Sequence, residues 1–203
     1  MISVYVSLES VPHGEQRRHA HGLLTECLAA AGAEYAFEKT PLILGEQGKP
    51  SLAERPDIFY NLSHAEGVCA CFANRDECGI DCECVREYRP RVARKVFSAD
   101  ELAALEAAAE GERDMLFFRI WTLKEAFVKA IGRGIGYPMN TVSFVFSGDE
   151  ISSNAAGWRF AQFIINETAV VSVCTKEKIR QKQTKIETQN KRLILNIKKE
   201  NAK

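Results

Sequence analysis

The hydrophobic pattern of this chain changes from a strand period to a helix period and back twice, and that order constrains the fold most. The first run predicts a strand at residues 2–8, a helix at 14–31 and a hairpin formed by residues 58–64 and 68–73. Gly and Pro residues break the segment between the helix and the hairpin. We therefore expect residues 33–57 to be a loop-rich connection.

The second run begins with another predicted strand and continues through three helices into three further strands. These elements are expected at residues 78–85, 90–96, 99–109, 113–131, 141–147, 158–165 and 168–175. The repeated order of strand, helix and strands predicts an α+β fold made of two similar halves. We place the N-terminal half at residues 1–77 and the C-terminal half at residues 78–175.

The remaining segment, residues 176–203, differs from both halves in composition. It holds ten Lys or Arg and three Glu, a net charge of +7, and it has no Gly or Pro. Such a composition is typical of solvated chain, so we expect this tail to be solvated or to form a frayed helix.

Composition and charge exclude several classes of protein. The 203 residues are 46% hydrophobic and carry a formal net charge of zero, as is typical of a soluble globular protein. No apolar run is long enough to span a membrane, and the first residues do not resemble a secretory leader. Because the tail carries +7, residues 1–175 carry a net charge of −7. A folded part that is acidic does not suit nucleic-acid binding. We expect a cytoplasmic monomer that binds neither nucleic acid nor membrane.

Acidic and basic residues that could carry chemistry lie on one predicted strand and one predicted helix. Asp81 and Glu83 are two residues apart on a strand, so they share a face, and Glu125 and Lys129 are neighbours on a helix. Either pair could also be an ordinary solvated surface feature. Three carboxylates together suit Mg²⁺, or Mn²⁺, better than zinc, and Lys124 and Lys129 suit an anionic substrate such as a phosphate.

Weaker signals lie in the predicted N-terminal half. Ser63 and His64 are adjacent, but no third acid is evident that would orient a nucleophile, so we interpret them as hydrogen-bond donors to phosphate. Lys49 stands between Gly and Pro in a loop, and Arg17 and Arg18 stand near a helix start. Each of these cations could be a solvated side chain or a phosphate contact.

Five of the seven cysteines, at positions 69, 71, 78, 82 and 84, fall within sixteen residues. They leave open a second kind of function, a thiolate metal-binding or redox-sensing module. The Cys78-x₃-Cys82 spacing fits a zinc knuckle, but the C-x-C pairs do not. Buried thiols that pack as small hydrophobic groups account for the cluster better.

Five motifs occur in a set order between Gly48 and Lys129: GKP, NLSH, GIDCE, FSADE and WTLKEAFVK. This order resembles the Sfp-type 4′-phosphopantetheinyl transferase family. The resemblance implies a pseudo-duplicated α+β fold with the active site in the cleft between two halves. It also implies a holo-[acyl-carrier-protein] synthase activity, which transfers the 4′-phosphopantetheine arm of coenzyme A to a serine of an apo acyl or peptidyl carrier protein and releases 3′,5′-ADP. A relative that binds coenzyme A without catalysis remains an alternative.

The resemblance also implies roles for individual residues. The expected Mg²⁺ ligands are Asp81, Glu83 and Glu125, and Glu125 is the expected general base, with Lys129 as its catalytic companion. The expected contacts to coenzyme A, the substrate, are Arg17 (with Arg18 as its competitor), Lys49, Ser63, His64, Lys124 and Lys129. The carrier protein is expected to face Arg86, Arg89, Arg91 and Arg94. Glu101 matches the acid of its motif, but with Ser98 it also forms a predicted capping box.

Overall fold

A computed structural model of the chain describes residues 2–134, 136–189 and 192–199. The helices are α1 (Gln16–Ala30), α2 (Pro90–Val96), α3 (Ala99–Ala107) and α4 (Glu110–Ile131), with short 3₁₀ turns η1 (His13–Glu15) and η2 (Met139–Thr141). The strands are β1 (Ile2–Ser7), β2 (Leu42–Leu44), β3 (Pro50–Leu52), β4 (Phe59–Ala65), β5 (Val68–Asn74), β6 (Cys78–Cys84), β7 (Phe144–Ser147), β8 (Glu150–Ser153), β9 (Arg159–Ile165), β10 (Ala169–Thr175), β11 (Ile179–Gln189) and β12 (Arg192–Lys199). The α+β fold class is confirmed.

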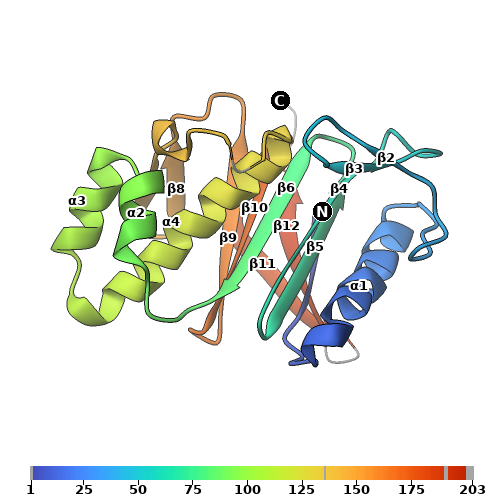
Figure 1. The fold of residues 1–203 in the computed structure, drawn as a ribbon, viewed down its shortest axis with the longest axis horizontal. Helices are drawn as coiled ribbons and strands as arrows, with labels where there is room; N and C mark the ends of the chain where they lie inside the picture. The colour runs from blue at the N-terminus through green and yellow to red at the C-terminus, as the bar shows by residue number, and fades with distance from the viewer. Residues whose placement is uncertain (1, 135, 190–191, 200–203) are drawn as a thin grey trace.

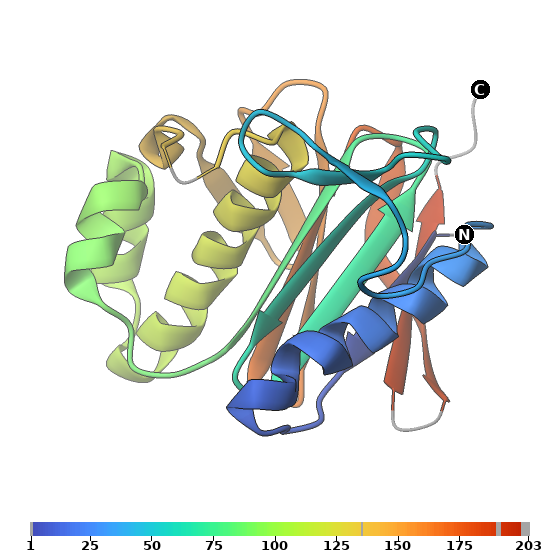
Figure 2. The ribbon, with the colours of Figure 1, turned by 45° about the vertical axis from the view of Figure 1, so that its right-hand side comes forward.

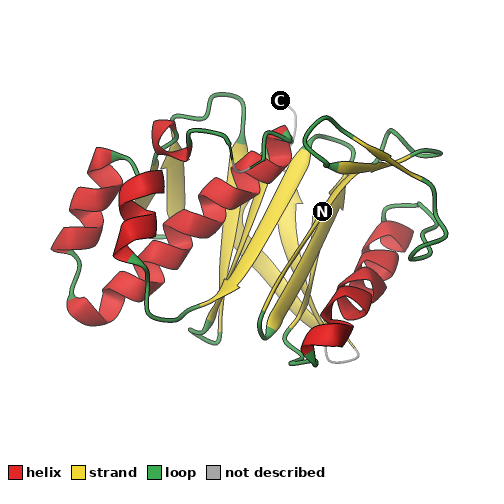
Figure 3. Ribbon diagram, in the orientation of Figure 1, coloured by secondary structure: helices red, strands yellow, loops and turns green. Residues whose placement is uncertain are grey.

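Two antiparallel sheets form the centre of the molecule. One has the strand order β11-β12-β1-β5-β4 and the other has the order β6-β10-β9, while β2-β3 and β7-β8 form small hairpins. Helix α1 lies on one side of the strands and helices α2, α3 and α4 lie on the other side (Figures 1 and 2). Colouring by secondary structure shows the strands enclosed between the helices (Figure 3). No helix among the described residues is long and apolar enough to cross a lipid bilayer.

The main hydrophobic core lies between the two sheets. Val4 and Phe72 from the five-stranded sheet, and Ile80 and Phe163 from the three-stranded sheet, belong to one buried cluster. Alternate residues of the same strands face the helices, as the two-residue period of a strand requires. Cys71, for example, packs in a second cluster with residues of α1.

The tail is not a solvated segment or a frayed helix, and that expectation is wrong for the described part of residues 176–203. Strand β12 pairs with β1, and β11 pairs with β12. Leu195 and Ile197 are buried in the core between the sheets, with Leu193 packed against it. These three residues alternate along the chain, so in a strand they form one apolar face that covers β1 and its neighbours. The division at residue 77 stays a prediction.

Helix α4 lies directly on the backbone of strand β6 at Gly79. A Cβ atom at this position would lie 2.1 Å from the carbonyl oxygen of Ala126 and 2.5 Å from the amide nitrogen of Ala130. Only glycine permits this approach. Asp81, two residues further along β6, therefore points to the same side of the sheet as α4.

The substitution Gly79→Ala is expected to lower the free energy of unfolding by about 1–3 kcal/mol, because the new methyl group must push α4 away from β6. Urea unfolding followed by circular dichroism measures this change. The matched control is Gly22→Ala in α1, where nothing lies within 4 Å of the added Cβ. That change is expected to raise stability by about 0.5–1 kcal/mol. A neutral Gly79→Ala variant would contradict the close contact.

Candidate active site

Three side chains from three elements meet in the space between β4, β6 and α4. Lys129 Nζ donates to Asp81 Oδ1 at 2.6 Å and to Ser63 Oγ at 2.9 Å, and Ser63 Oγ donates to the same Asp81 oxygen at 2.8 Å. Asp81 and Ser63 are buried, and Lys129 is partly exposed. The structure thus joins one residue from each of the NLSH, GIDCE and WTLKEAFVK motifs.

Glu125 faces the same region from α4. Trp121, Glu125 and Lys129 recur at every fourth position, so they lie along one side of the helix. Burial raises the pKa of the Glu125 carboxyl to about 7, and the negative charges of Asp81 and Glu83 act in the same direction, while Lys129 opposes them. Asp81 and Glu83 are therefore close enough to Glu125 to affect its protonation.

Asp81 and Glu83 differ in which cation offsets their negative charge. Burial raises the pKa of Asp81, although Lys129 and Ser63 counteract part of this shift. The neighbouring Asp81 in turn raises the pKa of Lys129, against the effect of burial. Glu83 accepts a hydrogen bond from Arg86 Nη1 at 2.9 Å.

The fit of this region to a divalent cation rests on an excess of negative charge. Asp81 Oδ2 is buried and has no hydrogen-bond partner among the described residues, which is costly for a carboxylate oxygen. No three His, Cys, Asp or Glu side chains of the described residues are grouped closely enough to hold a metal. Lys129 is instead the cation that Asp81 contacts, so a metal ion would compete with Lys129 for this carboxylate. The donor chemistry fits a hard cation, but the ligand set is not assembled beforehand.

Asp81, Glu83 and Glu125 are called the carboxylate cluster below. Lys49 does not lie with them but at the end of α4. Its ammonium donates to the carbonyl oxygen of Cys78 at 2.9 Å and to that of Ala130 at 2.8 Å. A cation is favourable there because the last carbonyl groups of a helix carry partial negative charge. Burial lowers the pKa of Lys49. In this structure Lys49 ties the start of β6 to the end of α4, and its expected contact with coenzyme A stays a prediction.

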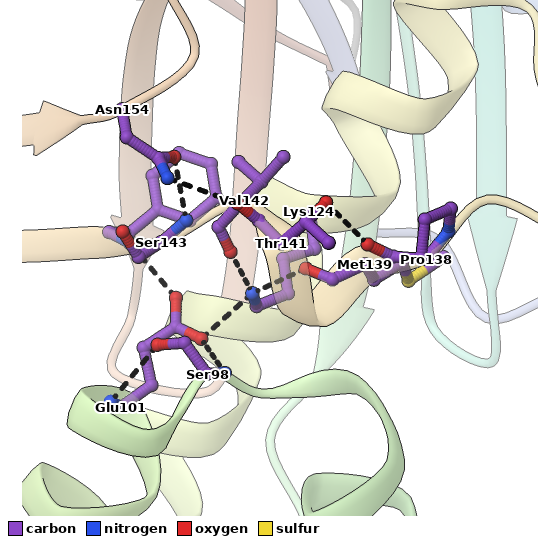
Figure 4. A network of polar contacts seen from close by, with 10 residues as sticks. Ser98, Glu101, Lys124, Pro138, Met139, Thr141, Val142, Ser143 and Asn154 are labelled. Carbon is purple, nitrogen blue, oxygen red and sulfur yellow. Dashed lines mark hydrogen bonds and ion pairs between the residues drawn. The ribbon is translucent and has the colours of Figure 1, made fainter.

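Lys124 is buried on another side of α4, with 1% of its side chain exposed. Its ammonium forms an ion pair with Glu101 at 2.7 Å and donates to the carbonyl oxygens of Met139 and Val142 (Figure 4). The expectation that Lys124 contacts the phosphates of coenzyme A is not supported by this placement. The sequence motif places Lys124 beside Glu125 in the chain, but adjacent helical residues point in directions about 100° apart.

Arg17 and His64 each lie near His21 of α1, a residue that the sequence did not single out. His21 Nδ1 contacts the Tyr35 hydroxyl at 2.6 Å, and the His21 ring stacks on Phe37 at 4.1 Å. Arg17 also lies over the Phe37 ring, with its guanidinium carbon 5.2 Å from the ring centre. Burial lowers the pKa of His21, and the charges of Arg17 and His64 add to this effect. Arg18 is exposed.

The cysteines do not form a metal or redox centre in the described residues. All seven are free thiols, and all except Cys84 are buried. Burial raises the pKa of Cys69 and of Cys78 to about 12, so at neutral pH these groups are thiols and not thiolates. The interpretation of the cysteines as small buried hydrophobic groups is confirmed for all of them except Cys84, which is partly exposed.

A pocket of about 170 Å³ lies next to the carboxylate cluster. Its wall includes Glu83 and Arg86 together with Phe117, Phe118 and Trp121 of α4. Trp121 is one helical turn before Glu125, so the pocket adjoins the face that carries Glu125 and Lys129. The region therefore offers an apolar surface beside a strongly charged one.

A concentration of carboxylates and one lysine beside a pocket is suited to binding and transferring a phosphorylated group, and comparison with known proteins agrees. The family model described as the 4′-phosphopantetheinyl transferase superfamily matches residues 77–180, which is half of the chain. The chain belongs to this superfamily. The resemblance noted in the sequence is thereby confirmed.

Individual relatives are similar at moderate identity. The 4′-phosphopantetheinyl transferase Sfp of Bacillus subtilis (strain 168) is 30% identical over 112 residues, which cover 54% of this chain and 50% of that protein. The 4′-phosphopantetheinyl transferase AcpT of Escherichia coli (strain K12) is 34% identical over 136 residues, which cover 63% of this chain and 68% of that protein. The chain spans about half the length of Sfp and of a second Bacillus subtilis transferase.

The match to the crystal structure of Thermotoga maritima holo-[acyl-carrier-protein] synthase covers 59% of this chain and 81% of the Thermotoga maritima chain, with 19% sequence identity and a TM-score of 0.40.

The raised pKa of Glu125 predicts a pH dependence of stability in metal-free protein. The folded state holds this proton up to about pH 7, whereas the unfolded chain releases it near the ordinary value of 4.5. Stability is therefore lost as pH rises through this window. In EDTA, wild-type protein is expected to lose roughly 1–2 kcal/mol more between about pH 5 and pH 8 than Glu125→Gln does.

Urea unfolding at both pH values measures the difference. Glu112→Gln, an exposed position on the same helix, is the matched control and should follow the wild type. Equal pH slopes for Glu125→Gln and wild type would show that Glu125 is not in a buried, acidic environment.

Proposed function

We propose that this chain transfers the 4′-phosphopantetheine arm of coenzyme A to a serine of an apo acyl or peptidyl carrier protein. The observation that carries the proposal is the meeting of Ser63, Asp81 and Lys129, with Glu125 on the same helix face. The proposed by-product is 3′,5′-ADP, which makes the reaction that of a holo-[acyl-carrier-protein] synthase. We further propose that the chain acts as a cytoplasmic monomer.

The chain's own residues supply three parts of this chemistry. Lys129 and Ser63 can donate hydrogen bonds to a diphosphate, which stabilises the negative charge that develops on it during transfer. Glu125, with a pKa of about 7, can accept the proton of the carrier serine near neutral pH. Because Lys129 now contacts Asp81, its ammonium must turn from this carboxylate toward the phosphates when the substrate enters.

A divalent cation is part of the proposal. Asp81, Glu83 and Glu125 are the residues that would hold Mg²⁺, or Mn²⁺, and the unpartnered Oδ2 atom of Asp81 supports this assignment. The ion would supply positive charge to the diphosphate leaving group.

Intact-mass analysis of an apo carrier protein tests the activity directly. Incubation with coenzyme A and Mg²⁺ is expected to add the mass of one phosphopantetheine to the carrier. Asp81→Asn and Glu125→Gln are each expected to slow transfer by about 10²-fold or more, because each removes a charge from the reaction centre. Glu112→Gln on the same helix is the matched control and should keep the wild-type rate.

A second measurement, of coenzyme A binding, separates an active transferase from a protein that only binds coenzyme A. Calorimetry with coenzyme A that shows binding, together with no mass change on several carriers, would identify a relative that binds without catalysis. If the protein neither binds coenzyme A nor modifies a carrier, the proposal as a whole is overturned.

The proposed carrier-binding surface lies around α2. Arg89, Arg91 and Arg94 are exposed there, while Arg86 is paired with Glu83 and lies over Phe118 at 4.8 Å. The family resemblance implies a carrier that is acidic around its serine, and exposed arginines suit such a partner. Arg86 therefore links this surface to the carboxylate cluster.

Reversal of two of these charges tests the surface. Arg91→Glu combined with Arg94→Glu is expected to raise the KM for the carrier about tenfold at low salt, and about 0.5 M salt should remove most of the difference. The KM for coenzyme A should stay unchanged. Arg159→Glu combined with Lys178→Glu, both at exposed positions away from α2, changes the net charge by the same amount and is the control. An unchanged KM for the carrier in the double variant would place the docking surface elsewhere.

A further inference from the structure

A buried ion pair next to the proposed catalytic residues joins four parts of the C-terminal region. Glu101 lies in the first turn of α3, and Lys124 lies in the middle of α4, and each side chain is 1% exposed. Lys124 also contacts the backbone of Met139 in η2 and of Val142 directly after it. Figure 4 shows these groups converging on the Lys124 ammonium.

The hydrogen-bonding capacity of this ammonium is fully used. A lysine ammonium has three N–H donors and no acceptor. The three donors of Lys124 are directed to Glu101 Oε2, Met139 O and Val142 O. No donor is left for a substrate phosphate.

Both oxygens of the Glu101 carboxylate also have partners. Its Oε2 atom accepts from Lys124 and from the Ser98 amide at 2.7 Å, and its Oε1 atom accepts from the Phe144 amide at 2.9 Å. A buried ion pair with these partners in place has one low-energy geometry, because a shift of either partner would strand a charge. The network therefore fixes how α4 is rotated relative to α3 and to the segment at residues 139–144.

That rotation determines where the next residue points. Successive helical residues are about 100° apart, so once Lys124 is held toward Glu101, Glu125 is held toward β6. Among the described residues, Glu125 has no hydrogen bond or ion pair that would fix α4 in this way. We infer that the Glu101–Lys124 pair is a positioning device that orients Glu125 and Lys129, and that Lys124 does not contact coenzyme A. This inference rests on the proposed function.

The competing explanation is a purely structural ion pair, and kinetics can separate the two. Reaction rates are sensitive to small displacements of a catalytic group, whereas substrate binding through other residues is not. A positioning role thus predicts a loss in kcat without a loss in affinity for coenzyme A. A phosphate-binding role for Lys124 predicts weaker affinity.

The test uses Glu101→Gln, Lys124→Met and the double variant in the full chain. Glu101→Gln is nearly isosteric and keeps one acceptor oxygen for the amides of Ser98 and Phe144, so it serves even if Lys124→Met fails to fold. The matched control is Glu106→Gln, an exposed position on the same helix α3. The measurements are kcat, the KM for coenzyme A, the calorimetric Kd for coenzyme A, and hydrogen exchange of the α4 amides.

Each single variant that folds is expected to lower kcat about tenfold or more, while the Kd for coenzyme A stays within about twofold of wild type. The double variant is expected to lose no more than the worse single variant, because both act through one interaction. The inference is overturned if Lys124→Met weakens coenzyme A binding tenfold while Glu101→Gln leaves kcat unchanged. It is equally overturned if kcat is unchanged in all variants.

Failure of the proposed function would be recognised separately. In that case the wild-type chain itself neither binds coenzyme A nor modifies a carrier. Hydrogen exchange then carries the test, since Glu101→Gln is expected to speed exchange of amides 122–130 about tenfold relative to Glu106→Gln. Unchanged exchange would show that the pair does not hold α4.

Discussion

The contact of helix α4 with the backbone of strand β6 is the constraint on which the rest of the site depends. At Gly79 the strand has no side chain, so the helix comes close enough for Lys129 to reach Asp81. Lys49 strengthens the same junction from the first half of the chain, because its ammonium joins the carbonyl groups of Cys78 and Ala130. The glycine and lysine of two separate motifs thus act on one helix end.

The two lysines of the WTLKEAFVK motif show how one helix can serve different purposes on different sides. Lys124 and Lys129 are five residues apart, which places them about 140° apart around α4. One is enclosed by a carboxylate and two carbonyl groups, and the other reaches a carboxylate and a hydroxyl near solvent. Only the second has the exposure that a substrate contact requires. The two lysines look alike in the sequence, but Lys124 forms a buried ion pair and Lys129 lies where a substrate can reach it.

The sequence predicted most elements because their hydrophobic periods are strong. Helix α2 was predicted at its observed bounds, and Asp81 and Glu83 were correctly placed on one strand face. The direction of Lys124 was not predictable, because a motif states which residues occur together and not what surrounds each one. The short β2-β3 hairpin was not predicted, and of the β7-β8 hairpin only β7 was predicted. The contacts of His21 with Tyr35 and Phe37 were not predicted either, because they depend on tertiary packing.

The tail was misread because its charges dominate its composition, although Leu193, Leu195 and Ile197 alternate correctly for a strand. Its pairing with β1, in which Ile2 lies opposite Ile197 and Ser7 lies opposite Arg192, has a consequence for biosynthesis. A ribosome releases the amino-terminal strand first, and one edge of that strand stays open until residues 192–199 emerge. Closure of the sheet thus waits for nearly the whole chain, and such long-range pairing forms slowly. During that interval the open edge could join a strand of another molecule, so this pairing is where assembly is most exposed to aggregation.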